Sequence, residues 1–220
     1  MENKYKHCPN CNSEIKEGAF ITTEIIGHGR AQLINDFTEN KAEEFCSKCY
    51  APLLNSAIAN WKTQFNENSE SLKNSLPHIP VITLQQPLNW NYKVLGMVTG
   101  QSVTGTGIIS EIAASFTDLF GAQSGKFGNK IKGGEDICKA QLRLSAAQIG
   151  ATAVIGTDID YSEVGGGKGM LMVCMSGTAI KLENLEVLDT EAAEKLSNIK
   201  SLAKTFNNLS RYQNIIMSLT

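Results

Sequence analysis

Neither sign of charge dominates this sequence, and it has no long apolar run. Its 220 residues contain 20 lysines and arginines against 22 aspartates and glutamates, a formal net charge of -2. This balance gives no field that would draw the protein to nucleic acid or anionic lipid. No stretch approaches the roughly 20 apolar residues that cross a bilayer, and the N-terminus lacks the apolar core of a secretory signal. We therefore expect a cytoplasmic protein without a membrane or nucleic-acid partner.

Histidine and cysteine are also scarce. None of the three histidines lies beyond position 78, so the C-terminal part offers no histidine-based catalytic arrangement, and we predict no enzyme activity. Six cysteines are few for a secreted disulfide scaffold of this length. In a reducing compartment, paired Cys-x-x-Cys units indicate metal binding before disulfides.

Two such units are present, and their thiols are Cys8, Cys11, Cys46 and Cys49. Each unit can present two thiolates to one ion, and four thiolates complete a tetrahedral shell for zinc. A closed shell leaves no position for a substrate, so we predict a structural zinc site. A rubredoxin-like iron site and a redox dithiol are the alternatives. His7 and His28 could replace a thiol, but beside four cysteines we expect them to be bystanders.

The first 51 residues are predicted to form a small, β-rich, zinc-ribbon-like module. Residues 18–37 alternate apolar and polar side chains, and Gly-His-Gly at 27–29 suits a turn between strands. The 34 residues between the two cysteine pairs exceed the common ribbon spacing, but loop entropy grows slowly with length. Asn12 follows the first pair where glycine is frequent, and asparagine tolerates the left-handed conformation that this position needs.

Two amphipathic helices are predicted outside this module. Residues 52–80 form a helical connector and linker, because apolar side chains recur at spacings of four, three and four before Pro77 and Pro80 end the helix. These side chains are Leu54, Ile58, Trp61 and Phe65. Residues 184–220 form the C-terminal helix, with Asp189 and Thr190 as candidate N-caps.

Residues 81–183 alternate strand and helix signals in an α+β order. Strands are predicted at 81–84, 91–100, 152–164 and 169–182, and helices at 107–121 and 135–150. In the last strand, Met170, Met172 and Cys174 share one face, and Leu171 and Val173 share the other. Neither face suits water, so the second apolar face predicts a partner subunit or a covering helix.

The stretch from about 91 to 182 resembles the YbjQ-like family, which is associated with heavy-metal binding. The shared motifs are Gly96-Met-Val-Thr-Gly100, Asp118-Leu-Phe-Gly121, Gly150-Ala-Thr-Ala-Val-Ile-Gly156, Asp158-Ile-Asp160-Tyr161 and the run from Gly169 to Lys181. The resemblance implies a dodecin-like strand-helix-strand-strand subunit that assembles into a ring, a pentamer. It implies no reaction.

The sequence departs from the family pattern at two places. The family usually shows Gly-Gly-Arg-Ser followed by a tyrosine before the second helix, whereas this chain has Gly121-Ala-Gln-Ser124 and then Phe127. Thr152 stands where aspartate or asparagine is usual. A role tied to that arginine or tyrosine does not transfer to this chain.

Three further groups could bind metal. Cys174 with its neighbouring methionines offers soft sulfur, but Met175 points away from Met172, and we expect these side chains to pack. Asp158 and Asp160 share one strand face and could hold a hard cation, although solvent exposure at the strand end is the plainer interpretation. Cys138 is isolated, and we expect it to be structural.

Together these patterns predict an oligomeric metal-binding scaffold that displays zinc ribbons on a YbjQ-like ring. Multivalent display would make weak ribbon contacts with a protein partner avid. The alternative is heavy-metal sensing, storage or detoxification through a second metal site in the YbjQ-like part.

Overall fold

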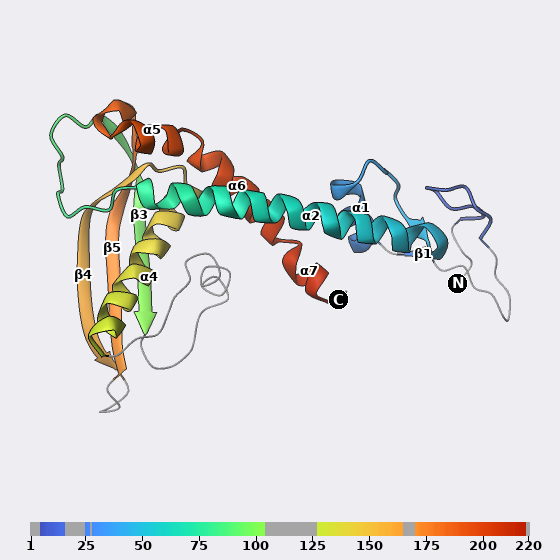
Figure 1. Ribbon diagram of the computed structural model, residues 1–220, viewed down its shortest axis with the longest axis horizontal. Helices are drawn as coiled ribbons and strands as arrows, with labels where there is room; N and C mark the ends of the chain where they lie inside the picture. The colour runs from blue at the N-terminus through green and yellow to red at the C-terminus, as the bar shows by residue number, and fades with distance from the viewer. Residues whose placement is uncertain (1–4, 16–24, 27, 104–126, 165–169, 219–220) are drawn as a thin grey trace. The chain divides into compact units, whose positions relative to one another are not determined.

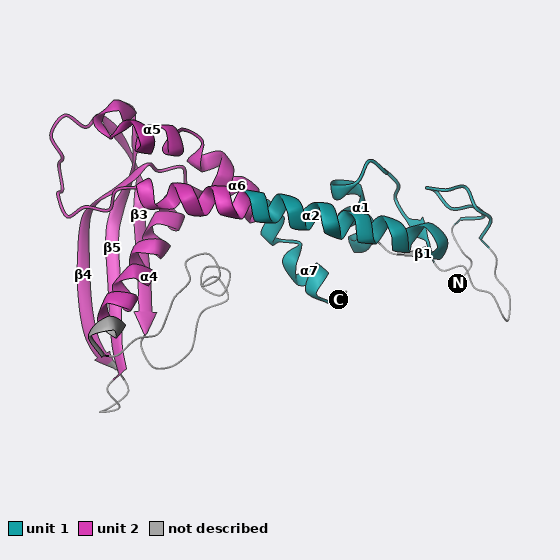
Figure 2. Ribbon diagram, in the orientation of Figure 1, with its two compact units in different colours: residues 1–67, 208–220 teal, residues 68–207 magenta. Residues whose placement is uncertain are grey.

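The structure of the protein, a computed structural model, contains two compact units (Figure 2). Unit 1 comprises residues 1–67 and 208–220, and unit 2 comprises residues 68–207. The structure describes residues 5–15, 25–26, 28–103, 127–164 and 170–218. Within these ranges, no helix combines the length and apolar character that a membrane span requires.

Unit 1 contains a two-stranded sheet and several helices. Strand β1 (Ile25–Ile26) pairs antiparallel with β2 (Phe45–Cys46), and helix α1 (His28–Phe37) lies between them in sequence. Helix α2 (Ser47–Ser75) follows β2 directly, and α7 (Gln213–Met217) lies near the C-terminus. Regular strand structure in the described part of this unit is therefore limited to two residues in each strand.

The prediction that strands and a turn fill residues 18–37 is wrong from His28 onward, where the chain forms α1. Ala31 and Ile34 are three residues apart, and Leu33 and Phe37 are four apart, so all four share one helical face. All four are buried in the core of unit 1. Burial of this face outweighs the short local alternation that suggested strands.

The core of unit 1 joins α1, α2 and the C-terminal segment. The Trp61 indole N–H donates to the Leu209 carbonyl at 2.9 Å, and its ring stacks on Phe65 at 5.1 Å. Phe37 meets Tyr212 edge to face at 5.2 Å. The apolar stripe predicted for residues 52–80 is confirmed, because all four of its members belong to this core or pack against it.

Unit 2 contains a three-stranded antiparallel sheet with strand order β3-β5-β4. The strands are β3 (Tyr92–Val103), β4 (Ala153–Val164) and β5 (Met170–Leu182). Helix α4 (Phe127–Gln148) lies against one face of the sheet (Figure 1). The mixed α+β class and the strand-helix-strand-strand order are thus confirmed, whereas the helix predicted at 107–121 lies outside the described residues. The segment predicted as a strand at 81–84 makes an isolated parallel bridge, Val81 with Val154.

Helix α4 approaches β3 closely at Gly100. A Cβ atom at this position would lie 2.5 Å from the Cys138 carbonyl oxygen on the helix. Only glycine admits a helix backbone at this distance. The Cys138 thiol is fully buried and donates to the Val173 carbonyl at 3.3 Å, as expected for a structural cysteine.

The two faces of β5 have different surroundings. Val173, Met175 and Ala179 are buried, whereas Met172 and Cys174, on the other face, are only partly buried. On β3, Met97 is 77% exposed and Val103 is 38% exposed. This part of the sheet therefore presents an apolar surface that no described residue covers, in line with the prediction of a second apolar face.

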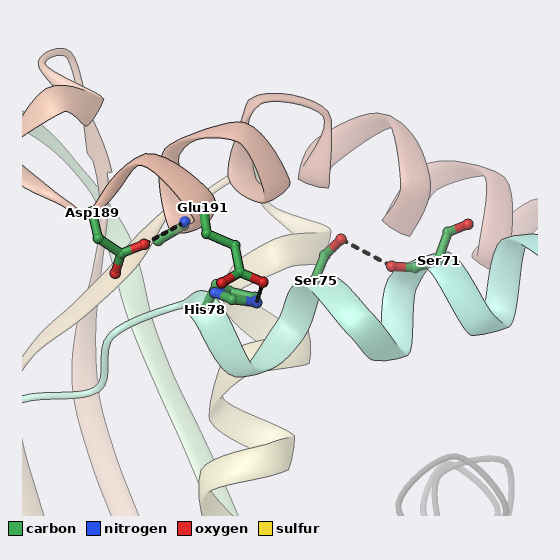
Figure 3. Close-up of polar contacts among 6 residues, drawn as sticks. Ser71, Ser75, His78, Asp189 and Glu191 are labelled. Atoms are coloured by element: carbon green, nitrogen blue, oxygen red, sulfur yellow. Dashed lines mark hydrogen bonds and ion pairs between the residues drawn. The ribbon is translucent and has the colours of Figure 1, made fainter.

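Several polar contacts link helical residues within unit 2. Helix α5 (Thr190–Ser197) begins after Asp189, whose carboxylate accepts the Ala192 N–H at 2.8 Å. Of the two predicted N-cap candidates, Asp189 is therefore confirmed, whereas Thr190 is the first residue of the helix. His78 in the 3-10 helix η1 (Leu76–His78) lies 3.8 Å from the Glu191 carboxylate, and Ser75 donates to the Ser71 carbonyl (Figure 3).

The remaining helical elements are η2 (Leu185–Val187) and α6 (Ile199–Ser210). Helix α6, like α2, contributes residues to both units.

Thr152, which departs from the family pattern, accepts the Leu182 N–H at 2.8 Å through its hydroxyl oxygen. Threonine therefore supplies the side-chain acceptor that a carboxylate or amide oxygen could provide at this position.

Candidate metal centre

The first cysteine pair lies in a tight hairpin. Cys8 N–H donates to the Ser13 carbonyl at 2.8 Å, and Asn12 N–H donates to the Cys8 carbonyl at 2.9 Å. Asn12 has a φ of 55°, which confirms the left-handed conformation predicted for it. This turn directs the Cys8 and Cys11 thiols toward the second pair.

The second pair lies where a strand passes into a helix. Cys46 is the last residue of β2, and Cys49 lies in the first turn of α2. The Cys46 N–H donates to the Cys8 sulfur at 3.3 Å, which ties the two pairs together.

All four sulfur atoms lie within 4.8 Å of one another. The separations are 3.6 Å for Cys11–Cys46, 3.8 Å for Cys8–Cys49 and 3.8 Å for Cys46–Cys49. A tetrahedral ion with metal–sulfur distances of about 2.3 Å has sulfur–sulfur edges of about 3.8 Å. The four free thiols therefore have the spacing of a tetrahedral thiolate shell, and a metal fits the residues present.

The four thiols differ in burial and in acidity. Cys8 and Cys46 are buried, Cys49 is half-buried and Cys11 is exposed. Hydrogen bonds with the Ser13 side chain and backbone lower the pKa of the Cys11 thiol to about 6, while burial raises the pKa of Cys49 to about 12. The thiolate is thus favoured at Cys11 and the protonated thiol at Cys49. A bound cation would remove the proton from Cys49.

Ser13 contacts a candidate ligand, and the sequence reasoning did not include it. Its hydroxyl lies 3.3 Å from the Cys11 sulfur. Its place two residues after a cysteine, in a turn, is a signal for this contact, because serine commonly bonds to nearby groups in turns. His7 is exposed and does not belong to the cluster of candidate ligands.

The other residues predicted as possible metal ligands lie on the sheet of unit 2. Cys174 and Asp160 are register partners on neighbouring strands, and Asp158 is paired with Ser176 one step along the same face. Nevertheless, within the described ranges the four cysteines are the only group of three or more ligand side chains that converge. Met175 is buried on the opposite face from Met172, so the two methionines do not share a site.

Comparison with known proteins finds a family match for the part of the chain that lies outside the cysteine cluster. The matching family is described as "Putative heavy-metal-binding". Residues 81–183 match the YbjQ-like family. A solved crystal structure from Pediococcus pentosaceus, of a protein of unknown function in the DUF74 family, is 20% identical, covers 48% of this chain and 98% of that chain, and has a TM-score of 0.31.

The match at residues 81–183 confirms the resemblance noted in the sequence from about 91 to 182. It does not include the four cysteines, which lie N-terminal to the YbjQ-like domain. Metal binding is therefore supported by two separate observations in different parts of the chain, the family match and the converging thiols.

Proposed function

We propose that this protein is a cytoplasmic, oligomeric metal-binding scaffold in which four thiolates hold one structural zinc ion. The observation that carries this proposal is the set of sulfur–sulfur distances of 3.6 to 3.8 Å. Zinc suits four thiolates in a tetrahedron and supplies charge neutralisation without redox chemistry. Four protein ligands leave no open position for a substrate, so the ion holds structure together.

The surrounding residues give a physical reason for a metal at this position. In the hairpin of residues 5–15, Cys8 is the only buried apolar side chain. So small an apolar contribution does not offset the entropy of ordering eleven residues, about 1 to 2 kcal/mol for each backbone unit. The α1–α2 core, by contrast, buries large side chains such as Phe45 and Leu33. Metal loss should therefore release the hairpin and leave this core folded.

The oligomeric part of the proposal rests on the uncovered sheet surface of unit 2. Met97, Val103 and Met172 lie on it, and exposed apolar surface of this kind favours a subunit interface. A closed ring, a pentamer by family resemblance, would bury this surface in every copy. It would also display several cysteine modules, so that weak contacts with a protein partner become avid.

Native mass spectrometry of the full chain tests the zinc site and the oligomer in one experiment, because it reports subunit number and bound metal together. The unmodified protein should be a ring with one zinc ion per chain. Cys46→Ser should lose that zinc and keep the ring, because residue 46 is remote in sequence from the proposed interface strands. A zinc-free monomer of the unmodified protein would contradict the proposal.

A second candidate function is metal sensing, storage or detoxification through the YbjQ-like domain. It is favoured by the register that pairs Cys174 with Asp160 on one sheet face, next to Asp158. Full-length Cys46→Ser should then bind copper(I), zinc or nickel, and the added Cys174→Ser substitution should abolish that binding. If Cys46→Ser binds none of these ions more tightly than the double variant, this second function is wrong.

A further inference from the structure

The four thiols of the metal centre are unequally accessible. Cys11 is exposed, whereas Cys8 and Cys46 are 2% and 0% exposed and Cys49 is half-buried. Cys11 also lies in the turn of the hairpin of residues 5–15, whose backbone–backbone hydrogen bonds are local, such as Ile15 N–H to the Lys6 carbonyl at 3.0 Å. A small polar oxidant in solution therefore reaches Cys11 before the other three.

A second thiol is in position to react with an oxidised Cys11. The Cys46 sulfur lies 3.6 Å from the Cys11 sulfur, and a disulfide has a sulfur–sulfur distance of about 2.04 Å. A displacement of about 1.5 Å would close this gap, and the Cys11 turn can supply it because that side chain is exposed. Cys46 itself is fixed between β2 and α2.

We propose that this centre is a peroxide-sensitive metal-release switch, in which Cys11 is oxidised first and Cys46 resolves it. The proposal rests on the zinc site proposed above and adds how that site is regulated. The oxidant it requires is hydrogen peroxide, a small peroxide able to reach an exposed sulfur. Reduction of the resulting disulfide by a thiol would restore the four ligands.

Disulfide formation between Cys11 and Cys46 proceeds in two steps. The Cys11 thiolate attacks one peroxide oxygen, so that a sulfur–oxygen bond forms, the oxygen–oxygen bond breaks and the departing hydroxide takes up a proton to become water. The sulfur of Cys11 is oxidised by two electrons to a sulfenic acid. The Cys46 thiolate then attacks that sulfur, a disulfide forms, and the hydroxyl group leaves as a second water after protonation.

The disulfide removes two of the four ligands. The Cys8 and Cys49 thiols alone do not complete a tetrahedral shell, so zinc affinity falls. The hairpin that carries Cys8 and Cys11 would gain a covalent bond to Cys46 and lose the link to Cys49 that the shared ion provides. Oxidation would therefore change both the metal content and the surface of the module in one event.

The experiment uses the full-length zinc-loaded protein, a titration with hydrogen peroxide and a chelating dye that reports free zinc. Thiols are then blocked, and the disulfide is located by peptide mass spectrometry. The expected result is release of one zinc ion per chain with a Cys11–Cys46 disulfide, and zinc uptake again after reduction. Cys138→Ser and Cys174→Ser should release this zinc at the unmodified rate, since neither belongs to the four-cysteine centre.

Cys11→His is the matched variant, because histidine is a zinc ligand that forms no disulfide. It should bind zinc and release it at least about tenfold more slowly under peroxide. Equal release rates, retention of zinc by the unmodified protein, or a disulfide that omits Cys11 would each overturn the proposal. If Cys11→His fails to bind zinc, disulfide mapping in the unmodified chain decides alone. A protein that takes up no zinc before peroxide is added would instead overturn the proposed zinc site.

Discussion

The cysteine module and the YbjQ-like domain differ in the length of their strands and in how their candidate metal ligands are arranged. In the module, the described strands are two residues long, and four sulfur atoms converge within 4.8 Å. In the domain, the strands are 12 or 13 residues long and pack against α4, and its described residues form no converging group of three candidate ligands. The region outside the heavy-metal-binding family match thus has the better assembled metal site.

Under the proposed function, metal binding would order the cysteine module, and apolar burial orders the YbjQ-like domain. A buried apolar side chain contributes about 1.5 to 3 kcal/mol, so a sheet with many such residues needs no metal. A hairpin with one buried cysteine needs another source of stability, and structural zinc sites supply an apparent 10 to 16 kcal/mol in small peptides. Perturbing one source of order should affect its own region and spare the other.

Removal of zinc should produce the largest effect, and only in the module. Cys46→Ser, or a strong chelator, should abolish amide protection in residues 5–15, because the hairpin has little apolar burial of its own. Hydrogen exchange measured by mass spectrometry checks this. The control is Cys174→Ser, which should leave the hairpin protected. Loss of protection in β3 or β5 as well would show that the two regions are not independently ordered.

Gly100→Val should produce an intermediate effect in the opposite region. The added side chain meets the Cys138 carbonyl oxygen, 2.5 Å from the new Cβ, and such overpacking costs about 1 to 3 kcal/mol. Urea denaturation, followed by a signal from the sheet, should show the lower free energy of unfolding. Zinc stoichiometry should not change. Gly133→Ala in α4 is the control and should not lower the free energy of unfolding, since a Cβ added there would meet no atom within 4 Å outside the neighbouring helix backbone.

The smallest effect concerns thiol reactivity and its dependence on pH. The pKa of Cys11 is lowered to about 6 by its hydrogen bonds with Ser13, and the pKa of Cys138 is raised to about 12 by burial. In metal-free protein, alkylation of Cys11 should therefore rise through about pH 6, whereas Cys138 should stay unmodified at about pH 8.

The shifted pKa of Cys138 also determines how this thiol's contribution to stability depends on pH. The raised pKa of Cys138 favours the folded state below the ordinary value of 9.0, and this contribution is lost as pH rises toward 12.

Ser13→Ala should move the Cys11 alkylation midpoint upward, because the thiolate loses a hydrogen-bond partner. Peptide mass spectrometry after timed alkylation measures both thiols. An unchanged midpoint would show that Ser13 does not set the acidity of Cys11.

Features with short-range causes could be predicted from the sequence. The two cysteine pairs, the left-handed Asn12, the Asp189 N-cap and the apolar face of α2 each depend on residues within one or two turns. The order of elements in the YbjQ-like domain also follows from local periodicity and from the family resemblance. All of these signals are carried by neighbouring residues.

The features that were missed depend on contacts between distant segments. Helix α1 forms because its apolar face is buried against Trp61 and Leu209, which are far away in sequence. The strand order β3-β5-β4 and the pairing of Asp160 with Cys174 are set by register, which no single strand encodes. The convergence of the four thiols could be proposed from spacing, but their distances could not.

X-ray absorption spectroscopy at the zinc edge of the purified protein tests the central claim most directly. The sulfur spacing predicts a first shell of four sulfur atoms at about 2.3 Å, with no nitrogen or oxygen ligand. The same measurement on Cys46→Ser should show that this four-sulfur shell is lost. A shell containing oxygen or nitrogen in the unmodified protein, or a protein without bound metal, would contradict the claim that these four cysteines hold the ion.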